Sequence, residues 1–447
     1  QGIPVNLAVV DTLWKKLLRN HAHDSIGGCN SDATNRDILH RLEQTEQLCH
    51  SLWNLVVKTL AAACVQDGDL LIFNSLATPT QRVVITTLYS RADNIALTHQ
   101  GQPIPFDVLE RDILPGGTAI SLNAEGECET PLPPYYRWHV AVKTPVLPPI
   151  GYLTVNVEED PAPFLASEKI KGSEIENAHY RLSLDAGTLT LHDKRSGRRI
   201  PSFFTFEDCA DAGDSYDFSP LAGDAPTRCS HFTLVDGVKT PLVEKLTVEA
   251  TMRLPQDLAS RQDTARTPLS IRLVCELRHD DPNLYVEASL ENSHCDHRLR
   301  LLIGSDVHTR HAIASQPFAI IQRETGYDGE HWQERYREKP VDIETSEGII
   351  AVTEPGKALV VTSRGMKEFQ IIGSEPAAIA LTMFKSTGVL GRSDLEWRPG
   401  RASGINNTVV ETPDAQLLKP LRFSFTVALA DNADHLTLRQ LENHAAG

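Results

Sequence analysis

The sequence has 447 residues and a mass of 49.3 kDa, which is enough for two to four domains at about 150 residues each. Hydrophobic residues make up 41% and charged residues 23%, as in ordinary globular proteins, which excludes a disordered or fibrous chain. The 43 Lys and Arg against 59 Asp and Glu give a net charge of −16, the wrong sign for a nucleic-acid or anionic-lipid partner, and no apolar run approaches the ~18 residues of a membrane span.

Residues 1–66 place apolar side chains at helical spacing in two sets, over residues 9–18 and 38–64. Gly27-Gly28 lies between the two sets. The pattern therefore predicts a helical-bundle segment made of two helices with a glycine break. A helical pair this amphipathic needs another surface to cover its apolar stripe.

The sequence defines the first residue of the second predicted helix only to within about one turn. Thr34 with Asp37 approximates a capping box, and Ser31 or Asp32 is an equally good N-cap. The sequence begins at Gln1 without a methionine and enters the first apolar set at once. We therefore expect that it is a piece of a longer protein.

From residue 67 the period of the apolar pattern falls to about 2, and Pro, Gly and Asn clusters separate strand-like runs. The pattern predicts a small β-sandwich over residues 67–165, followed by a large antiparallel sandwich over residues 166–447. The predicted fold is mainly β, with a helical N-terminal part, a small β-domain and a large antiparallel β-supersandwich.

Eight cysteines are spread through the chain without a C-x-x-C pair, so neither a zinc ribbon nor a disulfide scaffold is indicated. Reduced thiols fit a cytoplasmic protein. No basic segment followed by an apolar stretch marks a secretory signal near the start. We expect a cytoplasmic location.

The densest cluster of chemically active side chains is residues 19–28, where the first predicted helix ends. His23 and Asp24 offer an imidazole and a carboxylate, which are usual ligands of Zn²⁺. Neighbours on a helix point about 100° apart, so we expect one of the two to bind metal and the other to contact a substrate. The alternative, which spacing alone favours, is a histidine cap at the negative end of the helix dipole.

The motif Asn20-His21-Ala22-His23-Asp24-Ser25-Ile26-Gly27-Gly28 closely resembles the His-Asp motif of the zinc-dependent α-mannosidases, glycoside hydrolase family 38. The match is to the bacterial branch that includes mannosylglycerate hydrolases. Three later segments are similar to the β region of the same family: residues 71–76, residues 207–220 and residues 391–400. The resemblance covers nearly the whole chain.

The resemblance implies specific roles. His23 would be a zinc ligand, and Asp24 would bind sugar hydroxyls. The remaining zinc ligands and the nucleophile would lie in an N-terminal catalytic α/β domain that this sequence lacks, so no catalytic residue is assigned here. A single histidine cannot hold zinc firmly, and this chain alone is therefore predicted to be inactive.

Two further groups have a functional and a structural interpretation. Tyr216 and Asp217 either line a sugar site or form a solvated turn, which is the favoured alternative. Arg392, Asp394 and Arg398 either reach an anionic aglycone such as glycerate or form surface ion pairs, again the favoured alternative.

Other clusters point to structure. Residues 327–332 combine aromatic and polar groups that suit sugar stacking, and equally suit a loop packed on the sandwich. His294, Cys295 and His297 lie close in sequence but lack a fourth partner, so we expect a structural role. Residues 406–408 fit a glycosylation acceptor, which has no meaning in a cytoplasmic protein.

Taken together, the sequence predicts the C-terminal part of a zinc-dependent retaining α-mannosidase, with α-mannosides such as mannosylglycerate as substrates. Its partners would be the missing catalytic domain and the mannoside, and a homo-oligomer is left open. The alternatives are a non-catalytic carbohydrate-binding or assembly module and, by analogy of the sandwich with mutarotase-type folds, a sugar epimerase.

Overall fold

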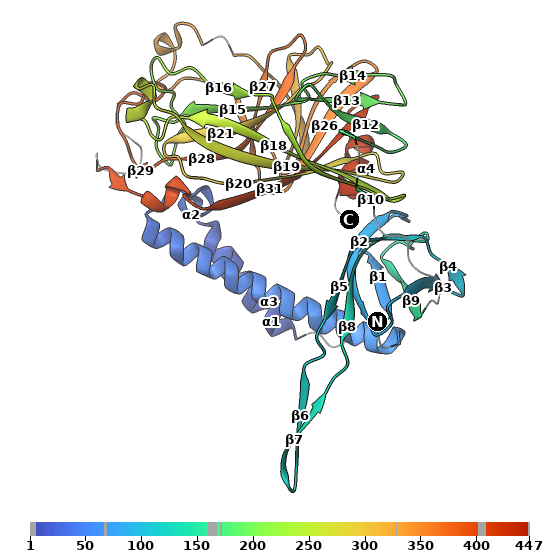
Figure 1. Cartoon of the computed structure of the whole chain (residues 1–447). Coiled ribbons are helices and arrows are strands. Elements are labelled where there is room, and N and C mark those ends of the chain that lie inside the picture. The colour runs from blue at the N-terminus through green and yellow to red at the C-terminus, as the bar shows by residue number, and fades with distance from the viewer. Residues whose placement is uncertain are drawn as a thin grey trace.

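The computed structural model describes residues 6–66, 69–159, 168–169, 172–327, 329–400 and 408–445. It is mainly β with a helical N-terminal part, as predicted (Figure 1). The predicted domain junctions at 66/67 and 165/166 adjoin or fall within undescribed residues, so these boundaries stay predictions. In the described ranges, no helix is both long and apolar enough to cross a membrane.

The N-terminal helices are α1 (Leu7–Leu18), the 3-10 turn η1 (Arg19–His21), α2 (His23–Gly27) and α3 (Asp32–Cys64). The two predicted helices are confirmed as α1 and α3. Ser31 is the N-cap of α3, because its Oγ accepts a hydrogen bond from the Thr34 amide at 3.4 Å. The short α2 was not predicted. Its C-cap is Gly28, whose φ of 77° suits glycine.

Helix α3 connects the two β regions of the chain (Figure 1). Near its start, Arg36 Nη2 lies 2.7 Å from Asp414 Oδ2 on the 3-10 turn η4 (Pro413–Gln416) of the large sandwich. Towards its end, the Trp53 ring packs edge-on against Phe73, with centroids 6.3 Å apart. The helix therefore fixes the N-terminal motif at one end of the large sandwich.

The small β-domain consists of two antiparallel sheets. One sheet has the order β1 (Leu70–Asn74), β9 (Gly151–Glu159), β3 (Ile95–His99) and β4 (Gln102–Pro103). The other has the order β2 (Val83–Ser90), β8 (Tyr135–Lys143) and β5 (Phe106–Leu114). Their apolar faces enclose a core around Trp138, whose Nε1 donates to Ser90 Oγ at 2.8 Å.

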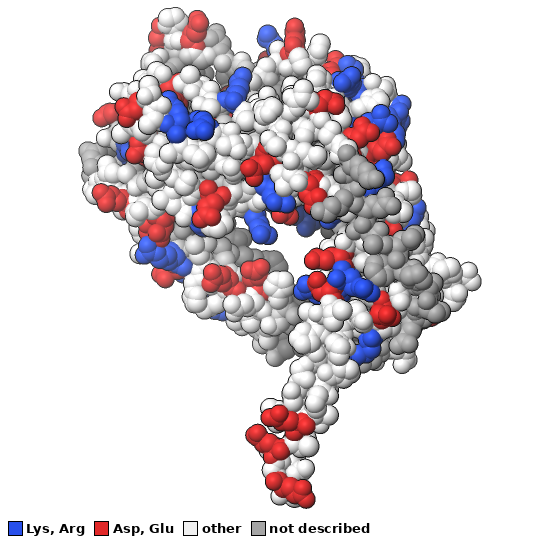
Figure 2. Space-filling model, viewed as in Figure 1, with Lys and Arg blue, Asp and Glu red and all other residues white. Residues whose placement is uncertain are grey.

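A two-stranded hairpin, β6 (Thr118–Asn123) and β7 (Gly126–Pro131), projects from this domain. All of its strand residues are exposed, and Figure 2 shows acidic side chains gathered along it. This projection was not predicted from the sequence.

The large sandwich contains sheets of ten, six and four strands. The ten-stranded sheet has the order β10 (Glu168–Lys169), β17 (Thr233–Lys239), β18 (Val243–Leu254), β19 (Thr267–Arg278), β20 (Leu284–Glu291), β31 (Pro420–Ala430), β26 (Lys357–Ser363), β25 (Ile349–Glu354), β22 (His311–Gln316) and β23 (Ala319–Glu324). The six-stranded sheet has the order β16 (Thr227–Cys229), β15 (Phe204–Ala210), β21 (His297–Ile303), β28 (Ala378–Ser386), β27 (Glu368–Ile372) and β24 (Ile343–Thr345). The four-stranded sheet has the order β11 (Glu174–Glu176), β12 (Tyr180–Asp185), β13 (Thr188–Asp193) and β14 (Arg199–Ile200).

One continuous apolar core lies between these sheets, with Phe203, Phe204 and Phe206 among its largest fully buried side chains. The remaining small elements are η2 (Ala259–Gln262), η3 (Trp332–Glu334) and the strand pair β29 (Val389–Leu390) and β30 (Val410–Glu411). Strand pairing is antiparallel throughout the sandwich, as the alternating sequence pattern predicted.

A C-terminal helix, α4 (His435–Ala445), was not predicted. It buries Leu438 and Leu441 against Ala358 and Val360 of β26 and Ala428 of β31. The helix therefore covers part of the outer face of the ten-stranded sheet, over β31 and β26.

Glu207 on β15 forms a buried ionic cluster inside the six-stranded sheet. Its side chain is 1% exposed, and its two oxygens accept hydrogen bonds from Arg300 Nε at 3.0 Å and Arg228 Nε at 2.8 Å. Burial alone would raise the pKa of Glu207, but Arg300 and then Arg228 hold that pKa below its ordinary value. The carboxylate therefore stabilises the fold only where it is ionised.

This cluster predicts a pH dependence of stability. Because the folded pKa of Glu207 is depressed, its contribution is present above the unfolded value of about 4.3 and is lost as the pH falls through the folded pKa. Urea unfolding measured from neutral to acidic pH should show a shallower loss of stability for Glu207→Gln than for the unchanged chain. Parallel curves for the two proteins would show that Glu207 has no such role.

Candidate functional site

His23 and Asp24 lie at an exposed tip of the helical part. The His23 side chain is 94% exposed and the Asp24 side chain 58%, and His23 Nε2 lies 3.2 Å from Asp24 Oδ1. His23 opens α2, whereas the residue that caps the C-terminus of α1 is Arg19. The alternative in which His23 caps the end of the first helix is therefore wrong.

The turn between α2 and α3 holds Asp24 in place through its backbone. The Asp24 carbonyl accepts hydrogen bonds from the Cys29 amide at 3.1 Å and from Asn30 Nδ2 at 3.0 Å. The Cys29 thiol in turn donates to the Ser215 carbonyl at 3.5 Å. The tip therefore contacts a loop of the large sandwich that lies 186 residues further along the chain.

That loop follows β15 and is organised by the fully buried Asp214. Its Oδ1 accepts the backbone amides of Tyr216 at 3.0 Å and Asp217 at 3.1 Å, and its backbone carbonyl accepts Lys385 Nζ at 2.9 Å. Tyr216 and Asp217 are half-buried. Hydrogen bonds to Asp214 therefore anchor both residues, whereas the favoured prediction was a solvated turn.

Arg398 joins this loop to the segment of residues 391–400. Its Nη2 donates to Asp214 Oδ2 at 2.7 Å and to the Arg392 carbonyl at 2.8 Å, and its Nη1 donates to Asp217. The Arg398 side chain is 7% exposed, so the predicted surface ion pair is in fact a buried one. Asp394 stays exposed and pairs with the backbone of Gly400.

The electrostatics show that the tip and the loop share one environment. Burial raises the pKa of Tyr216, and the negative potential of Cys29, Asp24 and Asp214 raises it further. Burial also raises the pKa of the Cys29 thiol. Tyr216 therefore keeps its phenol proton and can act as a hydrogen-bond donor.

The loop requires a glycine at position 213. A Cβ there would lie 2.0 Å from the Asp217 carbonyl oxygen and 2.8 Å from Asp211 Oδ1. We therefore expect Gly213→Ala to lower the free energy of unfolding by about 1 to 3 kcal/mol, as overpacking does, and to displace Tyr216. Urea denaturation measures the first effect. Gly172→Ala is the control, because its added Cβ meets no atom within 4 Å and its φ lies outside the left-handed region.

The donor set at the tip fits a zinc ion only in part. Structural and catalytic zinc sites use three or four protein ligands, usually His, Cys, Asp or Glu. Among the described residues, no group of three or more such side chains is placed to hold a metal. The imidazole of His23 is exposed and accessible from solvent.

The other candidate clusters are structural or undescribed. His297 Nδ1 lies 2.5 Å from Asp208 Oδ2 and its Nε2 lies 3.1 Å from Asn292 Oδ1, so both ring nitrogens are occupied, which confirms the structural prediction for His297. In residues 327–332, Trp332 is buried and Tyr327 half-exposed, while Asp328 lies outside the described residues. Asn406 and Asn407 of the glycosylation pattern also lie outside them.

In the sequence, the tip, the loop with Tyr216 and the segment with Arg398 are separate features. The structure brings them together, and adds Cys29, Ser215 and Lys385 as contacts. One feature of the sequence could have linked these segments in advance, because all three resemble the same protein family.

Comparison with known proteins agrees with this architecture. Residues 175–388 match the family described as the glycosyl hydrolases family 38 C-terminal domain. A protein of Halalkalibacterium halodurans named "Putative mannosylglycerate hydrolase" is 23% identical over 457 residues, covering 90% of this chain and 48% of that protein.

Two solved structures from Enterococcus faecalis share the fold. One, a protein in the glycosyl hydrolase family 38, is 17% identical with a TM-score of 0.79, and covers 99% of this chain and 55% of its own. The other, an α-mannosidase from strain V583, is 18% identical with a TM-score of 0.80, and covers 99% and 53%. The chain thus spans about half the length of the relatives that it matches. Over residues 175–388, the large sandwich thus matches the C-terminal domain of glycosyl hydrolase family 38.

Proposed function

We propose that this chain is the helical and β-sandwich part of a retaining α-mannosidase, and that His23 is one ligand of a zinc ion shared with an N-terminal catalytic domain. The observation that carries the proposal is the meeting of three distant segments at one exposed tip. The tip with His23 and Asp24 contacts the loop that carries Tyr216 through the Cys29 thiol, and Arg398 holds that loop in place through Asp214.

The residues at the tip have distinct tasks in this proposal. Asp24 accepts hydrogen bonds from sugar hydroxyls, and the protonated phenol of Tyr216 donates one. When bound, zinc would supply a Lewis acid that orients sugar oxygens. A retaining mechanism also needs two carboxyl groups about 5 Å apart, and we assign the nucleophile of this pair to the N-terminal domain.

The uncovered apolar surface of the helices supports a neighbouring domain. None of the residues of α1 is buried, and of the 33 residues of α3 only Ile38 and Thr45 are. Large apolar side chains exposed on the helices are Leu7, Trp14, Leu18, Ile26, Leu39, Leu42, Trp53 and Leu55. An apolar stripe this long is normally covered by protein. We propose that the catalytic domain covers it.

The substrate is proposed to be an α-mannoside, with mannosylglycerate as the specific candidate. The name of the Halalkalibacterium relative supports that candidate. A cytoplasmic location remains part of the proposal, and all eight cysteines are free thiols, which suits a reducing compartment.

The full-length protein should hydrolyse 4-nitrophenyl α-D-mannopyranoside or mannosylglycerate, with retention at the anomeric carbon by NMR. Removal of metal with a chelator should abolish turnover, and added zinc should restore it. Binding of mannosides without any hydrolysis would instead favour the carbohydrate-binding module.

The chain by itself should bind zinc weakly, because it offers one imidazole and one neighbouring carboxylate. In calorimetric titration we expect no stoichiometric submicromolar binding and no mannosidase turnover. The full-length protein is the positive control. Tight one-to-one binding by the 447-residue chain would show that the site is complete without another domain.

A further inference from the structure

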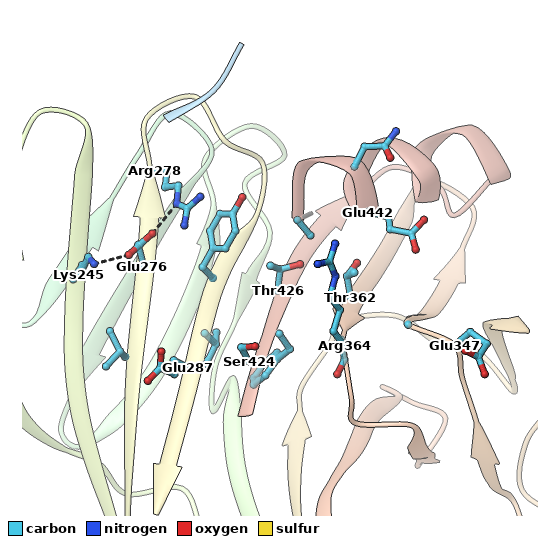
Figure 3. A pocket seen from close by; sticks show the side chains of 18 residues that line it. Lys245, Glu276, Arg278, Glu287, Glu347, Thr362, Arg364, Ser424, Thr426 and Glu442 are labelled. Atoms are coloured by element: carbon cyan, nitrogen blue, oxygen red, sulfur yellow. Dashed lines mark hydrogen bonds and ion pairs between the residues drawn. The ribbon is translucent and has the colours of Figure 1, made fainter. Parts of the chain in front are cut away.

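The ten-stranded sheet carries a row of polar and aromatic side chains on the face that points away from the core. Five residues lie directly opposite one another on five neighbouring strands. In order across the sheet they are Lys245, Glu276, Tyr285, Thr426 and Thr362. Residues directly opposite each other share one face of a sheet. The row therefore runs unbroken across β18, β19, β20, β31 and β26 (Figure 3).

This face is hollowed, which is unusual for the solvent side of an antiparallel sheet. Glu276, Thr362 and Thr426 are only 6 to 8% exposed. Residues of α4, including Glu442, form one wall, and the turn at Glu347 forms another. They enclose a cavity of about 540 Å³, a size that accommodates a small ligand.

The floor of the cavity has hydrogen-bonding capacity that the protein does not use. The hydroxyl of Thr426 is buried and has no hydrogen-bond partner in the described part of the chain. A buried hydroxyl without a partner destabilises the fold, so a ligand that pairs with it is favoured.

Charged groups beside Thr426 are fixed in place. Glu276 accepts Lys245 Nζ at 2.8 Å and Arg278 Nε at 2.7 Å. Burial would raise the pKa of Glu276, but Arg278 and Lys245 hold it below its ordinary value. The Arg278 guanidinium also lies over the Tyr285 ring, 3.9 Å from its centroid. These contacts preorganise donors and acceptors around the cavity.

The balance of charge indicates the class of ligand. Three cationic and four anionic side chains line the cavity, for a net of −1: Lys245, Arg278, Arg364, Glu276, Glu287, Glu347 and Glu442. A phosphate or polyanion would meet more carboxylates than cations. A neutral molecule with many hydroxyls can donate to the carboxylates and accept from the cations and threonines.

We propose that this cavity is a binding site for a neutral saccharide, separate from the tip that carries His23. The helices α2 and α4, which mark the two places, lie well apart in Figure 1. The inference goes beyond the proposed hydrolase function and does not depend on it, because no residue is shared between the two sites.

The test is calorimetry and saturation-transfer NMR on the 447-residue chain with methyl α-D-mannopyranoside, methyl α-D-glucopyranoside and sucrose. We expect one of these saccharides to bind one-to-one, and inorganic phosphate not to compete. Thr426→Val keeps the shape of the side chain and removes the unpartnered hydroxyl. It should raise the Kd of that saccharide about three- to tenfold, the effect of one lost hydrogen bond.

Thr233→Val is the matched control, because Thr233 is exposed on β17 of the same sheet and lies outside the cavity. It should leave the Kd unchanged. Glu287→Gln, at an exposed position of the lining, should weaken binding without disturbing the fold.

Two results would overturn the inference: no binding of any of the three saccharides, or equal Kd values for Thr426→Val and the unchanged chain. If His23→Ala abolished binding while Thr426→Val left it intact, the saccharide would sit at the tip. That result would reject the cavity and leave the proposed hydrolase function standing.

Discussion

Replacing His23 by alanine in the full-length protein is expected to lower kcat/KM for an α-mannoside by about a thousandfold or more, because a zinc ion contributes several kcal/mol to catalysis. The His23 side chain is almost fully exposed and contacts its neighbour Asp24. Its loss should therefore leave the fold intact, and the melting temperature should change little.

His21→Ala is the matched control for this experiment. His21 is exposed on the same tip, two residues away, and has no proposed role in metal binding. We expect nearly unchanged kinetics for this variant. Equal activities of His23→Ala and the unchanged enzyme would remove the ligand assignment, and equal losses in both variants would point to a general disturbance of the tip.

Replacing Arg398 by methionine is expected to lower the free energy of unfolding by about 3 to 5 kcal/mol, the range for breaking one side of a buried ion pair. The change leaves Asp214 fully buried without its guanidinium partner and releases Asp217 and the Arg392 carbonyl. Because these contacts hold Tyr216 beside the tip, KM for the mannoside should rise as well.

Arg439→Met is the comparison, since Arg439 forms an exposed pair with Glu442 and should contribute less than about 1 kcal/mol. The double variant Asp214→Asn with Arg398→Met should recover part of the loss, because no unpaired charge is then buried. A loss below 1 kcal/mol in Arg398→Met, measured by urea denaturation, would mean that water replaces the arginine.

The sequence predicted those elements whose pattern is local. Apolar residues at helical spacing defined α1 and α3, and Ser31 was one of three possible caps for α3. Alternation with period 2 located strands such as β8 and β9 and the antiparallel sandwich. These features depend on neighbouring residues, so they are readable from the chain alone.

Other features depend on contacts between distant residues. Arg398 lies in a polar segment that suits the surface, and only the sandwich topology places it over Asp214, 184 residues away, and out of water. Helix α4 was missed because its apolar residues Leu438 and Leu441 form a short stripe at the end of a strand-rich region. The polar row on the ten-stranded sheet arises only from the register of five strands.

The most direct test of the account is the zinc content of the full-length protein, measured by elemental analysis together with X-ray absorption at the zinc edge. We predict one zinc per chain with an imidazole in its coordination shell, and a loss of bound zinc in His23→Ala but not in His21→Ala. A full complement of zinc in His23→Ala, with an unchanged absorption spectrum, would contradict the central claim that His23 binds the metal.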